Sequence, residues 1–118
     1  MTVDTNGREV RAGTLCIRTH RDGSTCTVVL AGELDLANTD ELWGELKRAE
    51  NDGTAPSIVL DMTELEFIDS TGISILVAMH QRLNSDGDRF KLVRSEASAV
   101  NRVLALTGLD KSIPHVDS

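Results

Sequence analysis

Residues 57–72, SIVLDMTELEFIDSTG, carry the strongest structural signals in the chain. Residues 57–61 form a short apolar run after Pro56, which is typical of a strand that is covered on both faces. Residues 62–69 then read as a connection, and an apolar helix follows over about residues 72–85. A strand that leads through a connection into a helix predicts a crossover unit of an α/β domain.

The flanking segments extend this pattern. Two β-rich runs, residues 15–18 and 25–31, surround the dipeptide Asp22-Gly23, which is a strong hairpin signal. A helix is predicted to begin near Asn38, with its apolar residues at helical spacing. Downstream of residue 85 the pattern predicts a strand over 90–93, a helix capped by Ser95 that ends at Gly108, and then room for a short strand over 112–116.

The predicted element order is therefore β-β-α-β-α-β-α, with or without a last strand. This order implies one α/β domain with right-handed crossovers and a mixed, partly parallel sheet of four or five strands. Residues 1–13 lack periodicity and include two glycines, so we expect them to form a flexible leader before a domain over residues 14–118.

Length and composition fit a globular domain. The chain has 118 residues, of which 40% are hydrophobic and 26% are charged. Its formal charge of −7, without a basic stripe, argues against a nucleic-acid partner, as does an aromatic content of 3%. No apolar run approaches the roughly 18 residues that a membrane span requires.

The two cysteines are not expected to form a disulfide. A two-residue Asp22-Gly23 loop would pair residue 19 with 26 and residue 16 with 29, which would place Cys16 and Cys26 on opposite faces of the sheet. The N-terminal region also lacks the apolar segment of a signal peptide. Both observations favour a cytoplasmic protein.

Catalytic and metal-binding patterns are missing from the sequence. The three histidines stand without a G-x-S-x-G nucleophile motif, and neither zinc spacing nor a calcium-loop pattern occurs. Gly72 stands alone, so no glycine-rich loop could cradle a phosphate. We therefore expect no metal, no cofactor and no enzymatic activity.

The segment Asp69-Ser70-Thr71-Gly72 allows two interpretations. In the structural one, Asp69, Ser70 or Thr71 caps the following helix and Gly72 allows close approach of the chain. In the functional one, an exposed hydroxyl is modified. A phosphate would add about −1.5 to −2 charges, which a helix N-terminus tolerates, but a partner docked over it would have to desolvate that charge beside Asp69.

Four segments in order resemble the anti-sigma factor antagonists (anti-anti-sigma factors) of the STAS domain superfamily. They are residues 32–35 (GELD), 58–61 (IVLD), 65–72 (LEFIDSTG) and 103–113 (VLALTGLDKSI). The resemblance covers about residues 14–116 and implies a single STAS-like (SpoIIAA-like) domain. It also implies a non-enzymatic regulator that works by switching partners.

In that family the unphosphorylated antagonist binds an anti-sigma factor, usually a serine kinase of the histidine-kinase-like ATPase type, and this frees a sigma factor. The resemblance implies that the kinase phosphorylates Ser70, with Thr71 as the alternative acceptor, and that a serine phosphatase resets the switch. It assigns partner binding to Asp35, Asp69, Ser70, Thr71, Gly72, Ile73 and Leu76.

Some of these assignments have structural alternatives. Asp35 could instead be an ordinary loop or cap residue, and Ile73 and Leu76 could belong to the core. Two other functions also compete with the antagonist role. One is a STAS scaffold in a stressosome-like or lipid-transport complex, and the other is a small hydrolase that uses Ser70 as nucleophile, with Asp35, Asp69 or a histidine as its base.

Overall fold

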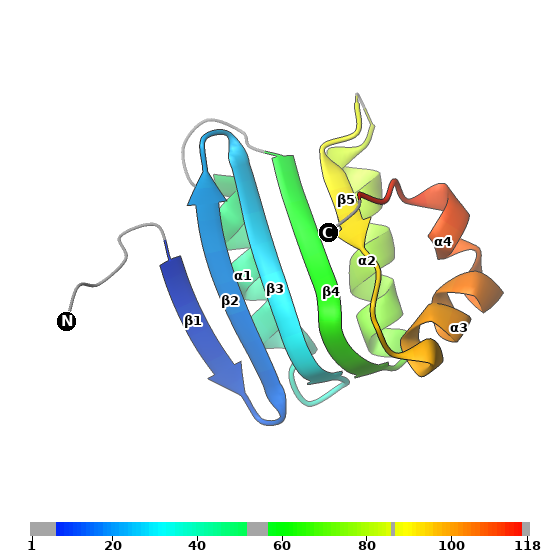
Figure 1. The fold of residues 1–118 in the computed structure, drawn as a ribbon. Helices are drawn as coiled ribbons and strands as arrows, with labels where there is room; N and C mark the ends of the chain where they lie inside the picture. The colour runs from blue at the N-terminus through cyan, green and yellow to red at the C-terminus, as the bar shows by residue number, and fades with distance from the viewer. Residues whose placement is uncertain (1–6, 52–56, 86, 117–118) are drawn as a thin grey trace.

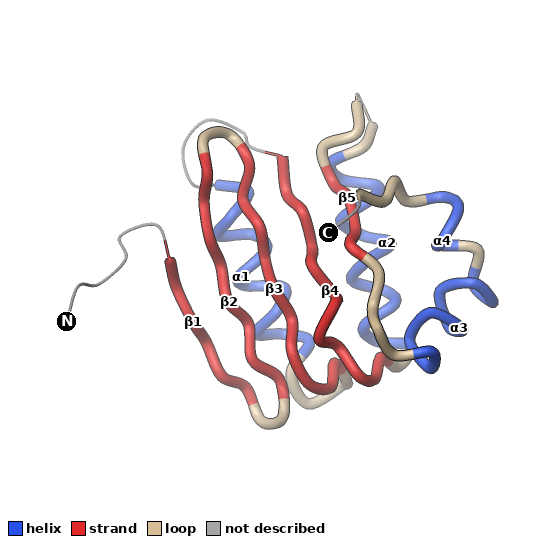
Figure 2. Tube along the Cα trace, in the orientation of Figure 1, coloured by secondary structure: helices blue, strands red, loops and turns tan. Residues whose placement is uncertain are grey.

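The computed structural model describes residues 7–51, 57–85 and 87–116. Within these residues the chain forms five strands and four helices (Figures 1 and 2). In chain order they are β1 (Gly7–Ala12), β2 (Leu15–Asp22), β3 (Thr25–Leu34), α1 (Thr39–Asn51), β4 (Ser57–Ile68), α2 (Ser70–Leu83), β5 (Phe90–Val93), α3 (Ser98–Thr107) and α4 (Leu109–Ser112).

The strands form one mixed sheet in the order β1-β2-β3-β4-β5. The first three strands are antiparallel to one another, whereas β3, β4 and β5 are parallel. Helices α1 and α2 make the two parallel crossovers and lie behind the sheet in Figure 1, so they cover the same face. The predicted single α/β domain with a mixed sheet is confirmed.

The core lies between the sheet and these two helices. Along β4 the burial alternates, because Ile58, Leu60 and Met62 point toward the helices and are fully buried. Val59 and Asp61 point to the other face and are only partly buried. The expectation that this strand is covered on both faces is therefore wrong, and the sheet has one open face.

The expected leader over residues 1–13 is wrong for residues 7–12, which form β1. This strand pairs antiparallel with β2, and Val10 lies opposite the buried Ile17. The Arg8 guanidinium also binds the Glu45 carboxylate of α1 at 2.9 Å. Because β1 is an edge strand with only Val10 and Ala12 as apolar residues, its sequence shows little periodicity. Residues 1–6 lie outside the described residues.

The expected connection over residues 62–69 is also wrong, because β4 continues to Ile68. The second half of β4 pairs with β3, and the last pair is Leu34 with Ile68. The register of this pairing shifts twice, once before Ala31 and once after Gly32 of β3. The strand therefore delivers the chain directly to α2. This helix begins at Ser70, two residues earlier than expected.

The hairpin between β2 and β3 differs from prediction in register. Gly23-Ser24 is the loop, since Asp22 lies opposite Thr25, and the predicted pairs 19–26 and 16–29 do not form. Cys16 lies on the open face and is partly exposed, whereas Cys26 is buried toward the helices. The two thiols lie on opposite faces of the sheet, as predicted.

The end of the domain departs from prediction at two points. Ser95 does not cap α3, because the N-cap of this helix is Ala97. The Ser95 hydroxyl instead donates to the Leu65 carbonyl at 2.6 Å and accepts from the Ala97 N–H. Helix α3 ends at Gly108, as predicted, but α4 follows in place of the start of a strand. Of residues 112–116, only His115 forms a β-bridge, with Leu92.

Gly32 provides a direct test of the close packing between β3 and the start of β2. Its φ of +104° disfavours any side chain, and an added Cβ would lie 2.0 Å from the Thr14 carbonyl oxygen. We expect Gly32→Ala to lower the free energy of unfolding in urea by about 2 kcal/mol or more. Gly44→Ala is the matched control: a Cβ there meets open space within α1, so stability should rise by about 0.5–1 kcal/mol. Equal effects of the two substitutions would show that the backbone at Gly32 is not closely packed.

Candidate functional site

Asp69 lies at the junction of β4 and α2. It directly follows the last residue of the strand, has an extended backbone and is the N-cap of the helix. Its own N–H donates to the Leu34 carbonyl at the end of β3, 3.2 Å away. The ends of two parallel strands are therefore joined at this residue.

The Asp69 carboxylate accepts hydrogen bonds from two separate segments. Oδ1 accepts from the backbone N–H groups of Thr71 (2.9 Å) and Gly72 (3.1 Å) and from the Thr71 hydroxyl. Oδ2 accepts from the Leu36 N–H at 3.1 Å, in the loop between β3 and α1. One side chain thus caps α2 and holds the neighbouring loop against it, which confirms that Asp69 is a helix cap.

These contacts change the acidity of Asp69. Burial alone would raise its pKa, but the hydrogen bonds outweigh that effect and lower the pKa below its ordinary value of 3.8. The Thr71 hydroxyl contributes most to the lowering, followed by the N–H groups of Gly72, Leu36 and Thr71. Asp69 is therefore a stable anion at neutral pH and a weak general base.

The loop over residues 35–38 places Asp35 next to this cluster. The Asp35 carboxylate accepts from the Ala37 N–H at 3.0 Å, and its carbonyl accepts from Asn38 and Thr39. The buried Asn38 side chain closes the turn by accepting from the Asp35 N–H and donating to the Glu33 carbonyl. Asp35 therefore shapes the loop that Asp69 holds, which agrees with the alternative that Asp35 is a loop residue.

The two candidate acceptor hydroxyls differ in their surroundings. Ser70 is exposed, and its hydroxyl makes no hydrogen bond to any residue that the structure describes. The Thr71 hydroxyl is only partly exposed and donates to Asp69. Ser70 is consequently the more accessible of the two.

Gly72 and Leu76 have no exposed surface to offer a partner. Gly72 is buried, and a Cβ there would lie 2.7 Å from Ile68 and 2.9 Å from Leu34, so close approach of α2 to the sheet needs glycine, as predicted. Leu76 is fully buried in the core. Its assignment to partner binding is therefore wrong, because this side of α2 faces the sheet. Ile73 is partly buried and packs against the core.

Two exposed apolar side chains near the site were not predicted. Leu36 is 74% exposed in the loop whose N–H binds Asp69, and Phe67 is 46% exposed near the end of β4. Their sequence signal is weak: Leu36 stands alone between Asp35 and Ala37, and Phe67 directly precedes the buried Ile68, so it reads as part of the same apolar segment. Leu36 lies in the loop that Asp69 holds, and Phe67 lies two residues before Asp69 in the chain.

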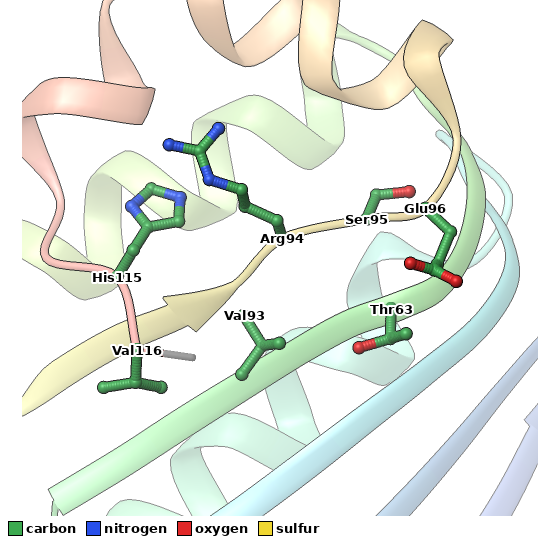
Figure 3. A pocket seen from close by; sticks show the side chains of 7 residues that line it. All are labelled: Thr63, Val93, Arg94, Ser95, Glu96, His115 and Val116. Atoms are coloured by element: carbon green, nitrogen blue, oxygen red, sulfur yellow. The ribbon is translucent and has the colours of Figure 1, made fainter. Parts of the chain in front are cut away.

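A pocket of about 280 Å³ lies elsewhere, between β4, the end of β5 and the C-terminal segment (Figure 3). Its hydroxyl groups are already engaged: Ser95 donates to Leu65, and Thr63 donates to Asp61. Since Ser95 gives its proton to a backbone carbonyl, it does not form a nucleophile–base pair with His115. The hydrogen bonds described for Ser95 and Thr63 hold the backbone and a neighbouring side chain in place, and neither hydroxyl is prepared for catalysis.

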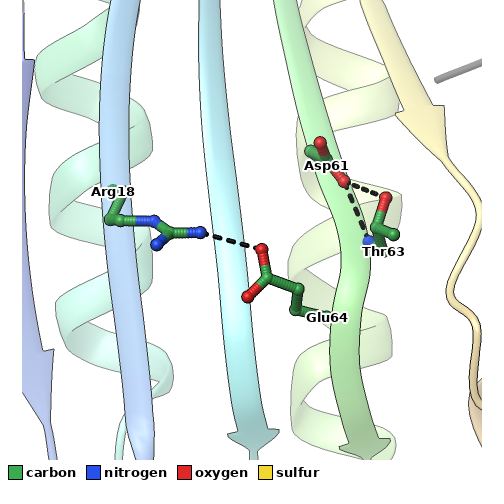
Figure 4. A network of polar contacts seen from close by, with 4 residues as sticks. All are labelled: Arg18, Asp61, Thr63 and Glu64. Atoms are coloured by element: carbon green, nitrogen blue, oxygen red, sulfur yellow. Dashed lines mark hydrogen bonds and ion pairs between the residues drawn. The ribbon is translucent and has the colours of Figure 1, made fainter.

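The open face of the sheet carries a polar network (Figure 4). An ion pair of 2.8 Å between Arg18 of β2 and Glu64 of β4 crosses over β3. Both side chains are about half exposed, so this pair contributes little to stability. Nearby, Asp61 accepts from the N–H and hydroxyl of Thr63, which repeats the arrangement of Asp69 and Thr71 without a helix N-terminus.

For the hydrolase alternative, no hydrogen bond among the described residues joins the Ser70 hydroxyl to Asp35, Asp69 or a histidine, and the Asp35 carboxylate accepts from the Ala37 N–H instead. His80 is ten residues further along α2, about 15 Å along the helix axis, and its Nδ1 contacts the Asn84 amide at 2.9 Å. His115 is bridged to β5, and Asp69 is held as an anion of low pKa.

Among the described residues, His, Cys, Asp and Glu form no group that could hold a metal ion. None of the described helices is long and apolar enough to cross a membrane.

Comparison with known proteins decides the family. The family described as "Mlab, STAS domain" matches residues 17–116. The chain belongs to the STAS domain family. Among curated proteins, the anti-sigma F factor antagonist of Paenibacillus polymyxa is 30% identical over 91 residues, which are 77% of each chain. The anti-sigma-B factor antagonist of Staphylococcus aureus is 30% identical over 90 residues, 76% of this chain and 81% of its own.

Solved structures of anti-sigma factor antagonists have the same fold. An anti-sigma factor antagonist from Mycobacterium paratuberculosis has a TM-score of 0.74 and 28% identity, covering 86% of this chain and 84% of its own. The unphosphorylated form of the anti-sigma factor antagonist SpoIIAA has a TM-score of 0.72 at 22% identity and covers 86% of this chain and 87% of its own. The curated relatives are named as antagonists of anti-sigma factors, a regulatory binding role, which agrees with the expectation that this STAS domain is not an enzyme.

The hydroxyl of Thr71 can be tested as the main cause of the low Asp69 pKa. We expect Thr71→Val to move the pKa of Asp69 upward toward its ordinary value, because the variant loses the hydrogen bond that lowers it most. The measurement is an NMR titration of the Asp69 carboxyl group into acid. Thr63→Val removes the equivalent hydroxyl from Asp61 and should leave Asp69 unchanged. An unchanged Asp69 pKa in Thr71→Val would refute this cause.

Proposed function

We propose that this STAS domain is an anti-sigma factor antagonist that binds an anti-sigma factor while Ser70 is unphosphorylated. Binding would release a sigma factor for transcription, and phosphorylation of Ser70 would end it. The observation that carries the proposal is the exposed Ser70 hydroxyl at the capped N-terminus of α2, with the exposed Leu36 in the loop that Asp69 holds and the exposed Phe67 two residues before Asp69. The names of the relatives from Paenibacillus polymyxa and Staphylococcus aureus support it.

The geometry around Ser70 explains why the domain would tolerate a phosphate. Asp69 already accepts the N–H groups of Thr71 and Gly72, so the cap of α2 does not depend on the Ser70 side chain. Since Ser70 is exposed, a phosphate can stay in solvent, and the positive end of the helix dipole favours its charge. The added charge therefore leaves the packing of the domain intact.

The same geometry explains why docking would be lost. A partner that covers the apolar side chains of Leu36 and Phe67 would also cover Ser70 and remove water from it. With a phosphate in place, the partner would desolvate about two negative charges beside the anionic Asp69. Burial of an unpaired charge of this kind is strongly unfavourable.

The enzymes of the switch follow from this role. We place an anti-sigma factor with serine kinase activity, which uses ATP, as the binding partner, and a serine phosphatase as the enzyme that resets Ser70. An exposed serine can be reached by both without unfolding. Two cysteines kept as thiols support a cytoplasmic location. The relatives' names favour this role over a scaffold in a stressosome-like or lipid-transport complex.

Substitutions at Ser70 test the switch. We expect Ser70→Ala to bind the anti-sigma factor like the wild type and to resist phosphorylation by it. Ser70→Glu should fold but bind at least about tenfold more weakly, because the added charge must be desolvated on docking. Isothermal titration calorimetry gives the affinities, and mass spectrometry after incubation with ATP gives the modified residue.

Ser98→Glu is the matched control, because Ser98 is also an exposed first residue of a helix. It should bind like the wild type. Equal affinities of Ser70→Glu and the wild type would contradict the switch. A phosphate found on Thr71 in place of Ser70 would overturn the residue assignment alone.

A further inference from the structure

We propose that β1 is a self-association edge, at which two copies of the chain pair antiparallel about a two-fold axis through Val10. The two five-stranded sheets would then join into one continuous sheet. This inference concerns the edge of the sheet away from α2 and is independent of the proposed switch at Ser70.

The two edges of the sheet differ in whether another segment of the chain covers them. At the β5 edge, Leu92 donates its N–H to the Pro114 carbonyl and accepts from the Val116 N–H, so the C-terminal segment covers this edge. At the β1 edge, none of the described residues pairs with the outer side of the strand. Uncovered strand edges are the places where sheets recruit a further strand.

The outer side of β1 offers a defined set of peptide groups. The hairpin to β2 is closed by the two-residue loop 13–14, with Ala12 opposite Leu15. Residues that flank such a loop bond to each other, and the direction of the peptide groups alternates along an antiparallel strand. Ala12, Val10 and Arg8 therefore bond toward β2, whereas Glu9 and Arg11 present their N–H and C=O groups outward.

The charges on this edge select one register. With the two-fold axis at Val10, Glu9 of each copy lies opposite Arg11 of the other, which gives two cross-strand ion pairs. The neighbouring registers that also match the outward peptide groups place Glu9 opposite Glu9 or Arg11 opposite Arg11, which is repulsive. In one chain the two side chains already contact each other at 3.1 Å on the same face, and they are 46% and 75% exposed.

The same register pairs the two Val10 side chains. Val10 is partly exposed and packs against the core on the helix face, so pairing would remove further apolar surface from water. The carboxyl end of β1 touches the loop of the candidate site, through the Asn38 amide and the Ala12 carbonyl at 3.4 Å. Antiparallel pairing puts these ends, and hence the two Ser70 residues, at opposite ends of the joined edge.

Reversing the charge of Glu9 or Arg11 distinguishes specific ion pairs between the two strands from an effect of the net charge of the chain. The full chain should sediment as a dimer in analytical ultracentrifugation, and Glu9→Arg and Arg11→Glu should each raise the dissociation constant by about tenfold or more. The two variants change the net charge of −7 in opposite directions, to −5 and −9. Were net repulsion the cause, Glu9→Arg would associate more tightly than the wild type.

A mixture of the two variants gives the decisive measurement. In a heterodimer of Glu9→Arg with Arg11→Glu, each Arg at position 9 or 11 lies opposite a Glu, so the equimolar mixture should dimerise more tightly than either variant alone. The double variant Glu9→Arg/Arg11→Glu should also regain dimerisation. A cooperative thermal unfolding transition in each variant shows that it is folded. A wild type that stays monomeric at all concentrations, or a mixture no more associated than its components, overturns the proposal.

Discussion

The candidate site depends on one carboxylate and the hydrogen bonds that it accepts. Asp69 binds the first turn of α2 through Thr71 and Gly72 and the loop after β3 through Leu36. Because its backbone also bonds to the end of β3, the residue fixes the geometry where two strands, a loop and a helix meet. The Thr71 hydroxyl, followed by the backbone donors, lowers the pKa of Asp69, so the anion that forms this junction persists further into acid.

This arrangement separates the stability of the domain from the chemistry of its surface. The helix is capped by Asp69, and the adjacent Ser70 is left exposed with its hydroxyl free of any described partner. A charge can therefore be added at Ser70 without removing a contact that holds the fold. The exposed Leu36 and Phe67 lie on the two segments that meet at the same junction, the loop after β3 and the end of β4.

Local chemistry in the sequence was sufficient to predict a capped helix start within residues 69–71, the close approach at Gly72 and the mixed α/β sheet, and the structure assigns the cap to Asp69. Features that depend on distant pairing were not predictable. β1 is an edge strand, and only two of its residues, Val10 and Ala12, are apolar. Its sequence therefore shows too little alternation to be distinguished from a flexible leader. The second half of β4 carries polar residues on its open face and reads as a connection until its pairing with β3 is known. Leu76 was misassigned because the first turns of α2 are apolar nearly all round, which hides the side that faces the sheet.

A phosphate on Ser70 is expected to abolish docking and to leave the domain folded. Both effects can be measured on one sample of protein phosphorylated at Ser70, by its thermal unfolding and by its affinity for the anti-sigma factor. We expect an unfolding temperature no lower than that of the unmodified protein and an affinity reduced by about tenfold or more. Retained affinity, or a loss of affinity that accompanies a clear loss of stability, would contradict the proposed switch.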